Sequence, residues 1–227
     1  RDLRRRPRPA RSRGTRSRGP RSSAVSPAAD PIEAAALAAL DGRLVVVPTD
    51  TVYGIGTRPD DPRATARLFD AKGRPRDLEL PVLVPSTEAA RRIAAFDHRA
   101  EVLALHFWAG ALTIVLPRSE SARSWDLGGD PATIGVRMPH DPLALAVLAR
   151  TGPLAVTSAN RSGAATPATC DELRATFGAA VDVYLCAPKP LGGSASTVVE
   201  LLHDIPRVLR RGAVSEPAVL AALREHV

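Results

Sequence analysis

Short apolar runs alternate with amphipathic stretches along the chain from about residue 30 onward. Apolar runs rich in β-branched residues and bounded by Gly, Pro or polar clusters predict strands. These runs occupy residues 44–47, 80–84, 111–116, 132–138, 154–157, 181–185, 196–202 and 206–210. Stretches that begin at a capping residue and show helical spacing predict helices. These stretches cover residues 30–40, 63–71, 86–95, 99–107, 141–149 and 169–177, and a last helix begins at Ser215. Asp30, Asp61 and Asp141 are each followed by a proline and are predicted to begin three of these helices.

Strands and helices mix throughout, and several connections are too short to hold a crossover helix. Neighbouring parallel strands need such a crossover, whereas antiparallel strands need only a turn. The pattern therefore predicts a single α/β domain over residues 30–227, built on a twisted, mixed and largely antiparallel sheet with flanking helices. The polar segment 117–131 is predicted to be a loop.

The stretch from residue 44 to residue 75 carries the most chemistry. A buried strand is followed by three small polar residues, Thr49, Asp50 and Thr51. A helix then ends at Lys72, so that Lys72 and Arg74 flank a turn and are expected to be exposed. A strand-end pocket that faces two cations predicts an anion site, in particular a phosphate site. The alternative is an ordinary turn and a lysine that only complements a helix dipole.

Further polar clusters follow other predicted strands, and ligands of α/β sheets gather at strand ends. They are Thr133 with Arg137, Ser158 with Asn160, Ser196 with Thr197, and the pair Arg210 and Arg211. Neither the P-loop nor the GxGxxG pattern is present, and no spacing indicates a catalytic triad or a metal site built from His and Cys. The residues alone therefore predict a site for an anionic small molecule, with the plain turn as the competing reading.

Composition narrows the class of protein. A hydrophobic content of 44% supports a sizeable core, and no apolar run approaches the ~20 residues of a membrane span. Cys170 and Cys186 show no metal-ligand spacing and suggest no disulfide framework. That usage is compatible with a reducing cytosol and predicts a cytoplasmic protein without a membrane segment.

The net charge of +7 is concentrated in one segment. Residues 1–23 hold ten Arg and one Asp, so the remaining residues carry a net charge of −2. Residues 1–29 are rich in Arg, Pro and Ser and are predicted to be disordered. An RNA-binding arm, an organelle transit peptide and a non-native extension are the three interpretations, and the last is favoured.

Seven motifs occur in order and at plausible spacings: PTDTVYGIG, a helix ending in AKGRP, FWAGALTIVL, IGVRMP, VTSANRSG, STVVEL and VLRRGAV. Together they resemble the YrdC-like family of threonylcarbamoyl-AMP synthases, in its short single-domain form, from about Asp30 onward. The resemblance implies a YrdC-like fold with a concave ligand cleft. It also implies a nucleotidyltransferase that converts ATP, L-threonine and bicarbonate to threonylcarbamoyl-AMP and pyrophosphate. Mg²⁺ would be bound through the phosphates and not by protein side chains.

The resemblance also implies how the product is used and which residues bind the substrates. A separate complex would transfer the threonylcarbamoyl group to the adenosine beside the tRNA anticodon. Lys72 and Arg74 would hold phosphates as the catalytic cations. The ATP-binding residues would be Lys72, Arg74, Thr133, Ser158, Asn160 and Arg210; the threonine-binding residues would be Thr49, Thr51, Arg137 and Ser196, with Arg137 pairing the carboxylate. Such a reaction needs positioned reactants and neutralised charge and no covalent nucleophile.

The sequence departs from the family pattern at several positions. Leu78-Glu79 and Leu83 replace an Asn-Pro pair and a His, Ala109 replaces a Pro, and Cys186-Ala187-Pro188 replace an Asp and glycines. These changes leave an alternative open, a non-catalytic YrdC-like protein that binds tRNA, double-stranded RNA or the ribosome. A carbamoyl-AMP-forming relative is a third interpretation. The retained cations favour the synthase.

Overall fold

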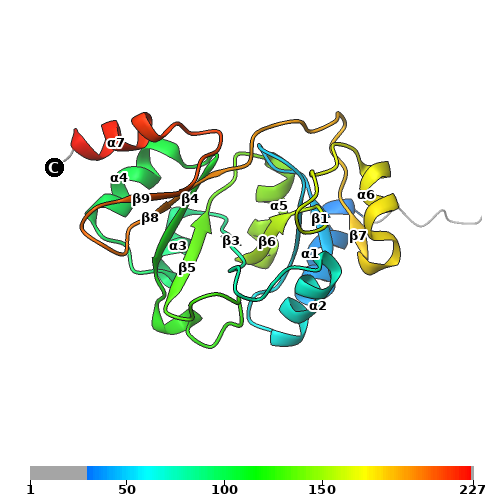
Figure 1. The fold of residues 1–227 in the computed structure, drawn as a ribbon. Helices are drawn as coiled ribbons and strands as arrows, with labels where there is room; N and C mark the ends of the chain where they lie inside the picture. Colours follow the sequence, from blue (N-terminus) through cyan, green and yellow to red (C-terminus); the bar gives the residue numbers. More distant parts are fainter. Residues whose placement is uncertain (1–29, 226–227) are drawn as a thin grey trace, which may run out of the picture.

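The computed structural model describes residues 30–225, which fold around one nine-stranded sheet (Figure 1). The strands are β1 (Val45–Val47), β2 (Gly54–Thr57), β3 (Val82–Leu83), β4 (Leu112–Pro117), β5 (Thr133–Arg137), β6 (Leu154–Ser158), β7 (Val183–Tyr184), β8 (Thr197–Glu200) and β9 (Arg207–Arg210). Their order in the sheet is β7-β1-β2-β6-β3-β5-β4-β8-β9. Within this sheet five pairings are antiparallel and three are parallel, which confirms the predicted mixed α/β fold.

Seven α-helices flank the described sheet. They are α1 (Pro31–Leu40), α2 (Pro62–Lys72), α3 (Thr87–Ile93), α4 (His98–Phe107), α5 (Pro142–Thr151), α6 (Cys170–Phe177) and α7 (Glu216–Arg224). Figure 1 shows α3, α4 and α7 beside β4, β5, β8 and β9, and the other four helices beside β1, β2, β6 and β7. Two short 3-10 helices, Glu120–Ala122 and Gly178–Ala180, complete the described elements. The first of them lies inside the segment predicted to be a loop.

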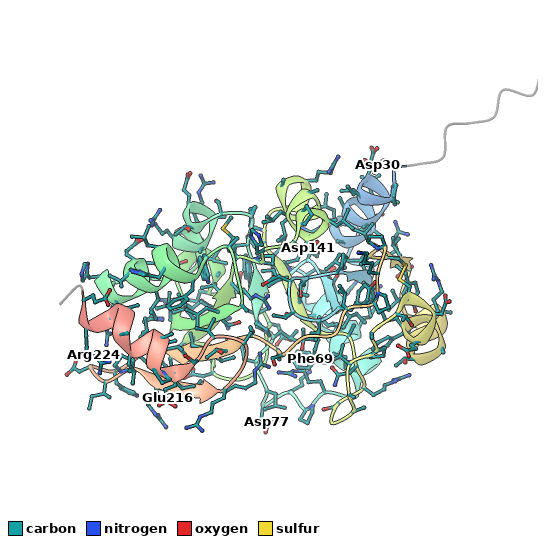
Figure 2. All side chains as sticks on the ribbon, turned by 90° about the horizontal axis from the view of Figure 1, so that it is seen from above. Asp30, Phe69, Asp77, Asp141, Glu216 and Arg224 are labelled. Carbon is teal, nitrogen blue, oxygen red and sulfur yellow. A yellow bond between two sulfur atoms is a disulfide. The ribbon has the colours of Figure 1, made fainter. Side chains whose placement is uncertain are left out.

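Acidic N-caps followed by proline fix where three of the helices begin. Asp30, Asp61 and Asp141 each accept a hydrogen bond from a backbone N–H of the first turn, and a proline follows directly. An acceptor satisfies a donor that the helix itself leaves unpaired, and proline at the first position needs no such acceptor. Figure 2 shows Asp30 and Asp141 at the starts of α1 and α5, which lie side by side in both views. These three predicted helix starts are confirmed.

Strand β2 was not predicted, because two of its four residues are glycine. Both glycines lie where β2 meets β6. A Cβ on Gly54 would lie 2.5 Å from Val156 Cγ1, and one on Gly56 would lie 2.6 Å from the carbonyl oxygen of Ala155. The close approach of the two strands explains why glycine is tolerated here, although it is a poor strand former.

The apolar core covers both faces of the sheet unevenly. Alternation along β1 sends Val45 and Val47 toward α1 and α5, and Val46 toward the larger cluster that includes α2. On β4, Leu112, Ile114 and Leu116 belong to the larger cluster, so Thr113 and Val115 point to the opposite face. That opposite face, with few helices to cover it, carries the cavities described below.

The two cysteines form a disulfide, contrary to the interpretation from their spacing. Cys170 begins α6 and Cys186 follows β7, and their Cα atoms are 5.8 Å apart. Figure 2 shows the bond beside α6. Their separation of 16 residues gave no hint of this, because the spacing does not tell whether the chain returns to the start of α6 after β7. Cysteine usage therefore no longer supports a reducing compartment.

The segment predicted to be disordered, residues 1–29, lies outside the described residues. Within residues 30–225, no helix is both long enough and apolar enough to cross a lipid bilayer.

The disulfide should contribute measurably to stability. Closing a loop of about 15 residues restricts the unfolded chain and is worth about 3 kcal/mol. We expect a reductant to lower the free energy of unfolding by about that amount, as measured by urea denaturation. The double variant Cys170→Ser/Cys186→Ser is the control and should not respond to the reductant. An identical unfolding midpoint with and without reductant in the unmodified protein would contradict the bond.

Candidate functional site

Two adjoining cavities open on the sheet face that carries Thr113 and Arg137. The first is lined by the turn after β1, the end of β3, β6 and the residues that lead into β8. The second is lined by the segment between α2 and β3 and by residues of β4, β5, β8 and β9. The residues that line both are Pro81, Thr113, Thr157, Ser158 and Arg210. The two cavities therefore form one continuous cleft.

A tight turn at residues 49–54 forms one wall of the first cavity. The Thr49 hydroxyl accepts the backbone N–H groups of Thr51 (3.2 Å) and Val52 (3.3 Å), and it donates to the carbonyl of Val52 (2.6 Å). Threonine next to small polar residues is well suited to such side-chain-to-backbone turns. The turn reverses the chain into β2 and presents the Thr51 side chain to the cavity.

Arg137, at the end of β5, is the buried cation of the first cavity. Its Nε donates to the carbonyl of Gly110 (2.9 Å), one terminal nitrogen donates to Thr51 Oγ1 (3.1 Å), and the other donates to Asp50 Oδ1 (2.7 Å). Burial lowers the pKa of the guanidinium, and Asp50 opposes that shift. Among the hydrogen bonds of the described residues, one N–H on each terminal nitrogen is left over. Two such donors match the two oxygens of a carboxylate.

Hydroxyl groups from neighbouring strands close the other side of this cavity. Ser196 Oγ lies 2.9 Å from Thr113 Oγ1. Arg210 donates from Nε and a terminal nitrogen to the carbonyl of Ser196, and from the same terminal nitrogen to Ser196 Oγ (3.0 Å). Burial lowers the pKa of Arg210. β8 pairs with both β4 and β9, and this pairing brings the three side chains together.

Lys72 lies behind the cleft, and the expectation that it is exposed is wrong. Only 2% of the residue is accessible, and its amine donates to the carbonyls of Ser158 (2.5 Å) and Asn160 (2.7 Å). The Asn160 side chain accepts from Ser158 Oγ (2.6 Å) and so joins the same turn. Burial, with a smaller effect from the nearby Arg74, lowers the pKa of Lys72 to about 8. Helix α2 ends here because Gly73 takes a left-handed conformation (φ 60°).

Arg74 lines the second cavity, is half-buried and not exposed as expected, and is held by its own segment. Its Nε donates to the carbonyl of Leu78 (3.1 Å), and a terminal nitrogen donates to the carbonyl of Glu79 (2.9 Å). Burial and then the charge of Arg210 lower its pKa. Two guanidinium groups that repel each other across a cavity wall favour an anion between them.

Glu79 brings a carboxylate to the same cavity. Its Oε1 accepts from Arg118 (3.1 Å), and its Oε2 lies 3.5 Å from the hydroxyl of Thr133. Burial raises the pKa of Glu79 to about 7, and the charge of Arg118 opposes this shift. Thr133 itself lines neither cavity; it shares a face of β5 with Arg137 but begins the strand that Arg137 ends.

The structure gathers most of the residues predicted from sequence. The first cavity is lined by Thr49, Thr51, Arg137, Ser196, Ser158 and Arg210, and the second by Arg74, Ser158 and Arg210. Lys72 and Asn160 contact the cleft only through Ser158. Thr133 lies apart from both.

Sequence reasoning missed the buried threonines Thr113 and Thr157, the partner role of Asp50, and the pair Glu79 and Arg118. Thr113 and Thr157 each interrupt an apolar strand, which is the signal that marks a polar residue facing a site. Leu83, in place of the family His, lines the first cavity, and Leu78, in place of the family Asn, lines the second.

The family model Sua5/YciO/YrdC, described as "Telomere recombination", matches residues 38–212. A putative threonylcarbamoyl-AMP synthase of Mycobacterium leprae is 43% identical over 192 residues, which cover 84% of this chain and 87% of that protein. The threonylcarbamoyl-AMP synthase of Pyrococcus abyssi is 37% identical over 176 residues, which cover 77% of this chain and 52% of that protein. The chain thus spans about half the length of this archaeal relative.

Solved structures of members of the same family are similar to this chain. The crystal structure of P. abyssi Sua5 complexed with L-threonine superposes with a TM-score of 0.77 at 33% identity, covering 84% of this chain and 56% of that one. The crystal structure of E. coli YciO superposes with a TM-score of 0.74 at 25% identity, covering 81% of this chain and 90% of that one. Both similarities extend over most of the described sheet and helices.

The buried amine of Lys72 should make stability depend on pH. Its folded pKa of about 8 lies below the ordinary value of 10.5. Lys72 therefore contributes stability that is fully present above about pH 10.5 and is lost as the pH falls through about 8. We expect the difference in unfolding free energy between the unmodified protein and Lys72→Met to move in favour of the unmodified protein as the pH rises across this range. A difference that is constant with pH would contradict the burial of a charged amine.

Proposed function

The chain belongs to the Sua5/YciO/YrdC family, and from this premise we propose that it forms threonylcarbamoyl-AMP and pyrophosphate from ATP, L-threonine and bicarbonate. It would thus be a nucleotidyltransferase. The product would pass to a separate complex that modifies tRNA beside the anticodon, in the cytoplasm. Direct binding of tRNA or double-stranded RNA is part of the same proposal. The names of the relatives support the synthase and not the non-catalytic RNA-binding alternative.

The observation that carries the proposal is the wall shared by the two cavities. Thr113, Thr157, Ser158 and Arg210 line both. A small amino acid in the first cavity and a nucleotide in the second would therefore meet across the same side chains. Adenylate formation needs such contact between an acceptor and the α-phosphate, because positioning supplies much of the rate.

The first cavity suits threonine. Its carboxylate would take the two remaining N–H donors of Arg137, and its polar side chain would face the hydroxyls of Thr51 and Ser196. The Thr49 hydroxyl, predicted as a ligand group, already holds the turn through its bonds to Val52. Thr49 would therefore act by shaping the turn.

The second cavity suits the phosphates of ATP. Arg74 and Arg210 would neutralise phosphate charge, and Lys72 would hold the Ser158–Asn160 turn against the nucleotide. We propose that Mg²⁺ arrives with ATP on its phosphates, as the resemblance to the family implies. The positive charges of Arg74 and Arg210 would stabilise the negative charge of the ATP phosphates.

The chemistry follows from this arrangement. The threonine amine would first react with bicarbonate to give a carbamate, with release of water. A carbamate oxygen would then attack the α-phosphate and displace pyrophosphate. The protein residues would position the two substrates and offset the negative charge that develops on the phosphates.

The decisive test is pyrophosphate release by the purified chain. Pyrophosphate should form from ATP only when threonine and bicarbonate are both present, and mass spectrometry should detect threonylcarbamoyl-AMP. Pyrophosphate release that does not depend on threonine or on bicarbonate would overturn the proposal. The absence of pyrophosphate release under all conditions would also overturn it.

Removing Arg74, one of the two cations that line the second cavity, should slow the reaction. Loss of one preorganised electrostatic group typically costs ~10²–10³ in rate. We expect Arg74→Ala to lower pyrophosphate formation by that factor. The matched control is Arg211→Ala, because the Arg211 side chain is 86% exposed and pairs only with Glu216 in the described structure. Equal rates in both variants would rule out the phosphate role of Arg74.

The first cavity should distinguish threonine from valine. Valine presents a methyl group where threonine presents a hydroxyl, and an unpaired buried polar group costs about 1–3 kcal/mol. In calorimetry with a non-hydrolysable ATP analogue, we expect valine to bind about tenfold to a hundredfold more weakly than threonine, and serine to bind closer to threonine. Thr51→Ser keeps the hydroxyl and should keep this preference. Valine binding as tightly as threonine would refute the threonine assignment.

A further inference from the structure

An ion pair joins two loops beside the second cavity; its Arg118 side chain is buried and its Glu79 side chain is 18% exposed. Residues 73–81 lead from α2 into β3, and residues 118–132 lead from β4 into β5. Leu80 N–H donates to the carbonyl of Leu127 (2.8 Å), and Gly129 N–H donates to the carbonyl of Arg76 (2.8 Å). Between these backbone bonds lies the ion pair of Arg118 with Glu79 (3.1 Å). We refer to this set of contacts as the Glu79 clasp.

Arg118 is the fixed half of the clasp. Its side chain is only 2% exposed, and its other donors reach the carbonyls of Thr133 (2.9 Å) and Trp125 (2.7 Å). Guanidinium geometry lets these bonds hold one orientation. Gly129 packs so closely on Glu79 that a Cβ there would lie 2.8 Å from Glu79 Cβ. The position of Glu79 is therefore set from two sides.

Arg74 takes its own orientation from the same residues. Its guanidinium donates to the carbonyls of Leu78 and Glu79, which form the backbone of the clasp. The Arg74 side chain is thus held by backbone that the Glu79 side chain anchors. If the Glu79 side chain is removed, those two carbonyls lose the side-chain anchor that fixes them against residues 118–132.

We infer that Glu79 and Arg118 are positioning residues for the phosphate-binding guanidinium of Arg74. This inference rests on the proposed function, in which Arg74 contacts the phosphates of ATP. Glu79 stands where the family pattern has proline. A proline ring would restrict the backbone of the loop, and here the Glu79 clasp restricts it instead.

Charge balance supports the same role. A carboxylate on the wall of an anion cavity repels the ligand unless a cation offsets it. Arg118, which is not among the residues that line the cavity, pairs with Glu79, so the Glu79 carboxylate does not need Arg74 or Arg210 to offset its charge. Figure 2 shows Asp77, in the same loop, projecting at the edge of the molecule between the part that carries Phe69 and the part that carries Glu216. The Glu79 clasp holds the other side of this loop against the segment between β4 and β5.

The test measures ATP binding directly, together with the kinetics. Glu79→Ala should weaken ATP binding in calorimetry and raise the KM for ATP about tenfold or more, as expected when a positioned group is misplaced. Threonine affinity should not change, because the first cavity does not include Glu79. Glu79→Gln should restore most of the ATP affinity, since its amide oxygen can still accept from Arg118. Asp126→Asn, which breaks the exposed ion pair with Arg76 in the same loops, is the matched control and should behave as the unmodified protein.

A double-mutant cycle distinguishes a Glu79 that positions Arg74 from a Glu79 that contributes to ATP binding separately. If Glu79 acts through Arg74, adding Glu79→Ala to Arg74→Ala should cause no further loss of ATP affinity. Additive losses, equal loss of threonine and ATP affinity, or a Gln variant as weak as the Ala variant would overturn the inference. If the unmodified protein binds ATP but releases no pyrophosphate, the proposed function fails and the binding cycle still tests the clasp. If it binds no ATP, both fail.

Discussion

The cleft depends on the ion pair between the buried guanidinium of Arg137 and the carboxylate of Asp50. The pair joins the end of β5 to the turn after β1, and the same guanidinium reaches Gly110 at the start of β4. Removing one partner of such a pair leaves a buried charge uncompensated, which costs several kcal/mol. Asp50 also accepts the backbone N–H of His140 (2.8 Å), so three separate segments meet at one carboxylate and one guanidinium. The wall of the first cavity exists because these segments are held together.

Backbone carbonyls hold the remaining cations of the cleft. Lys72 donates to Ser158 and Asn160, Arg74 to Leu78 and Glu79, and Arg210 to Ser196. A carbonyl orients a cation and satisfies its donors, but it does not cancel the charge. The cleft therefore keeps a positive potential, which burial strengthens because the local dielectric is low. This is an arrangement suited to a polyanionic substrate.

Two residues that depart from the family pattern, Leu83 and Leu78, lie on the walls of the cleft. Leu83 is buried at the end of β3, where it pairs in register with Arg137 and presents an apolar surface to the first cavity. Leu78 is about half exposed at the mouth of the second cavity. Neither change removes a cation or a hydroxyl that lines the cleft. The departures alter the walls of the cavities and leave the charged groups in place.

The sequence by itself determined the local elements and pointed to many of the residues that line the cleft. Capping aspartates with proline located three helix starts, apolar runs located all strands but β2, and ordered motifs identified Thr51, Arg137, Ser196 and Arg210. These signals are local, because capping, periodicity and strand-end polarity depend on neighbours within a few residues.

Only the tertiary structure decided how these pieces meet. The pairing of glycine-rich β2 with β6, the disulfide of Cys170 with Cys186, the burial of Lys72 and the Glu79 clasp each join residues far apart in the chain. Spacing along one sequence does not encode such contacts. They arise from the order of strands in the sheet, and that order is set by packing the whole core at once.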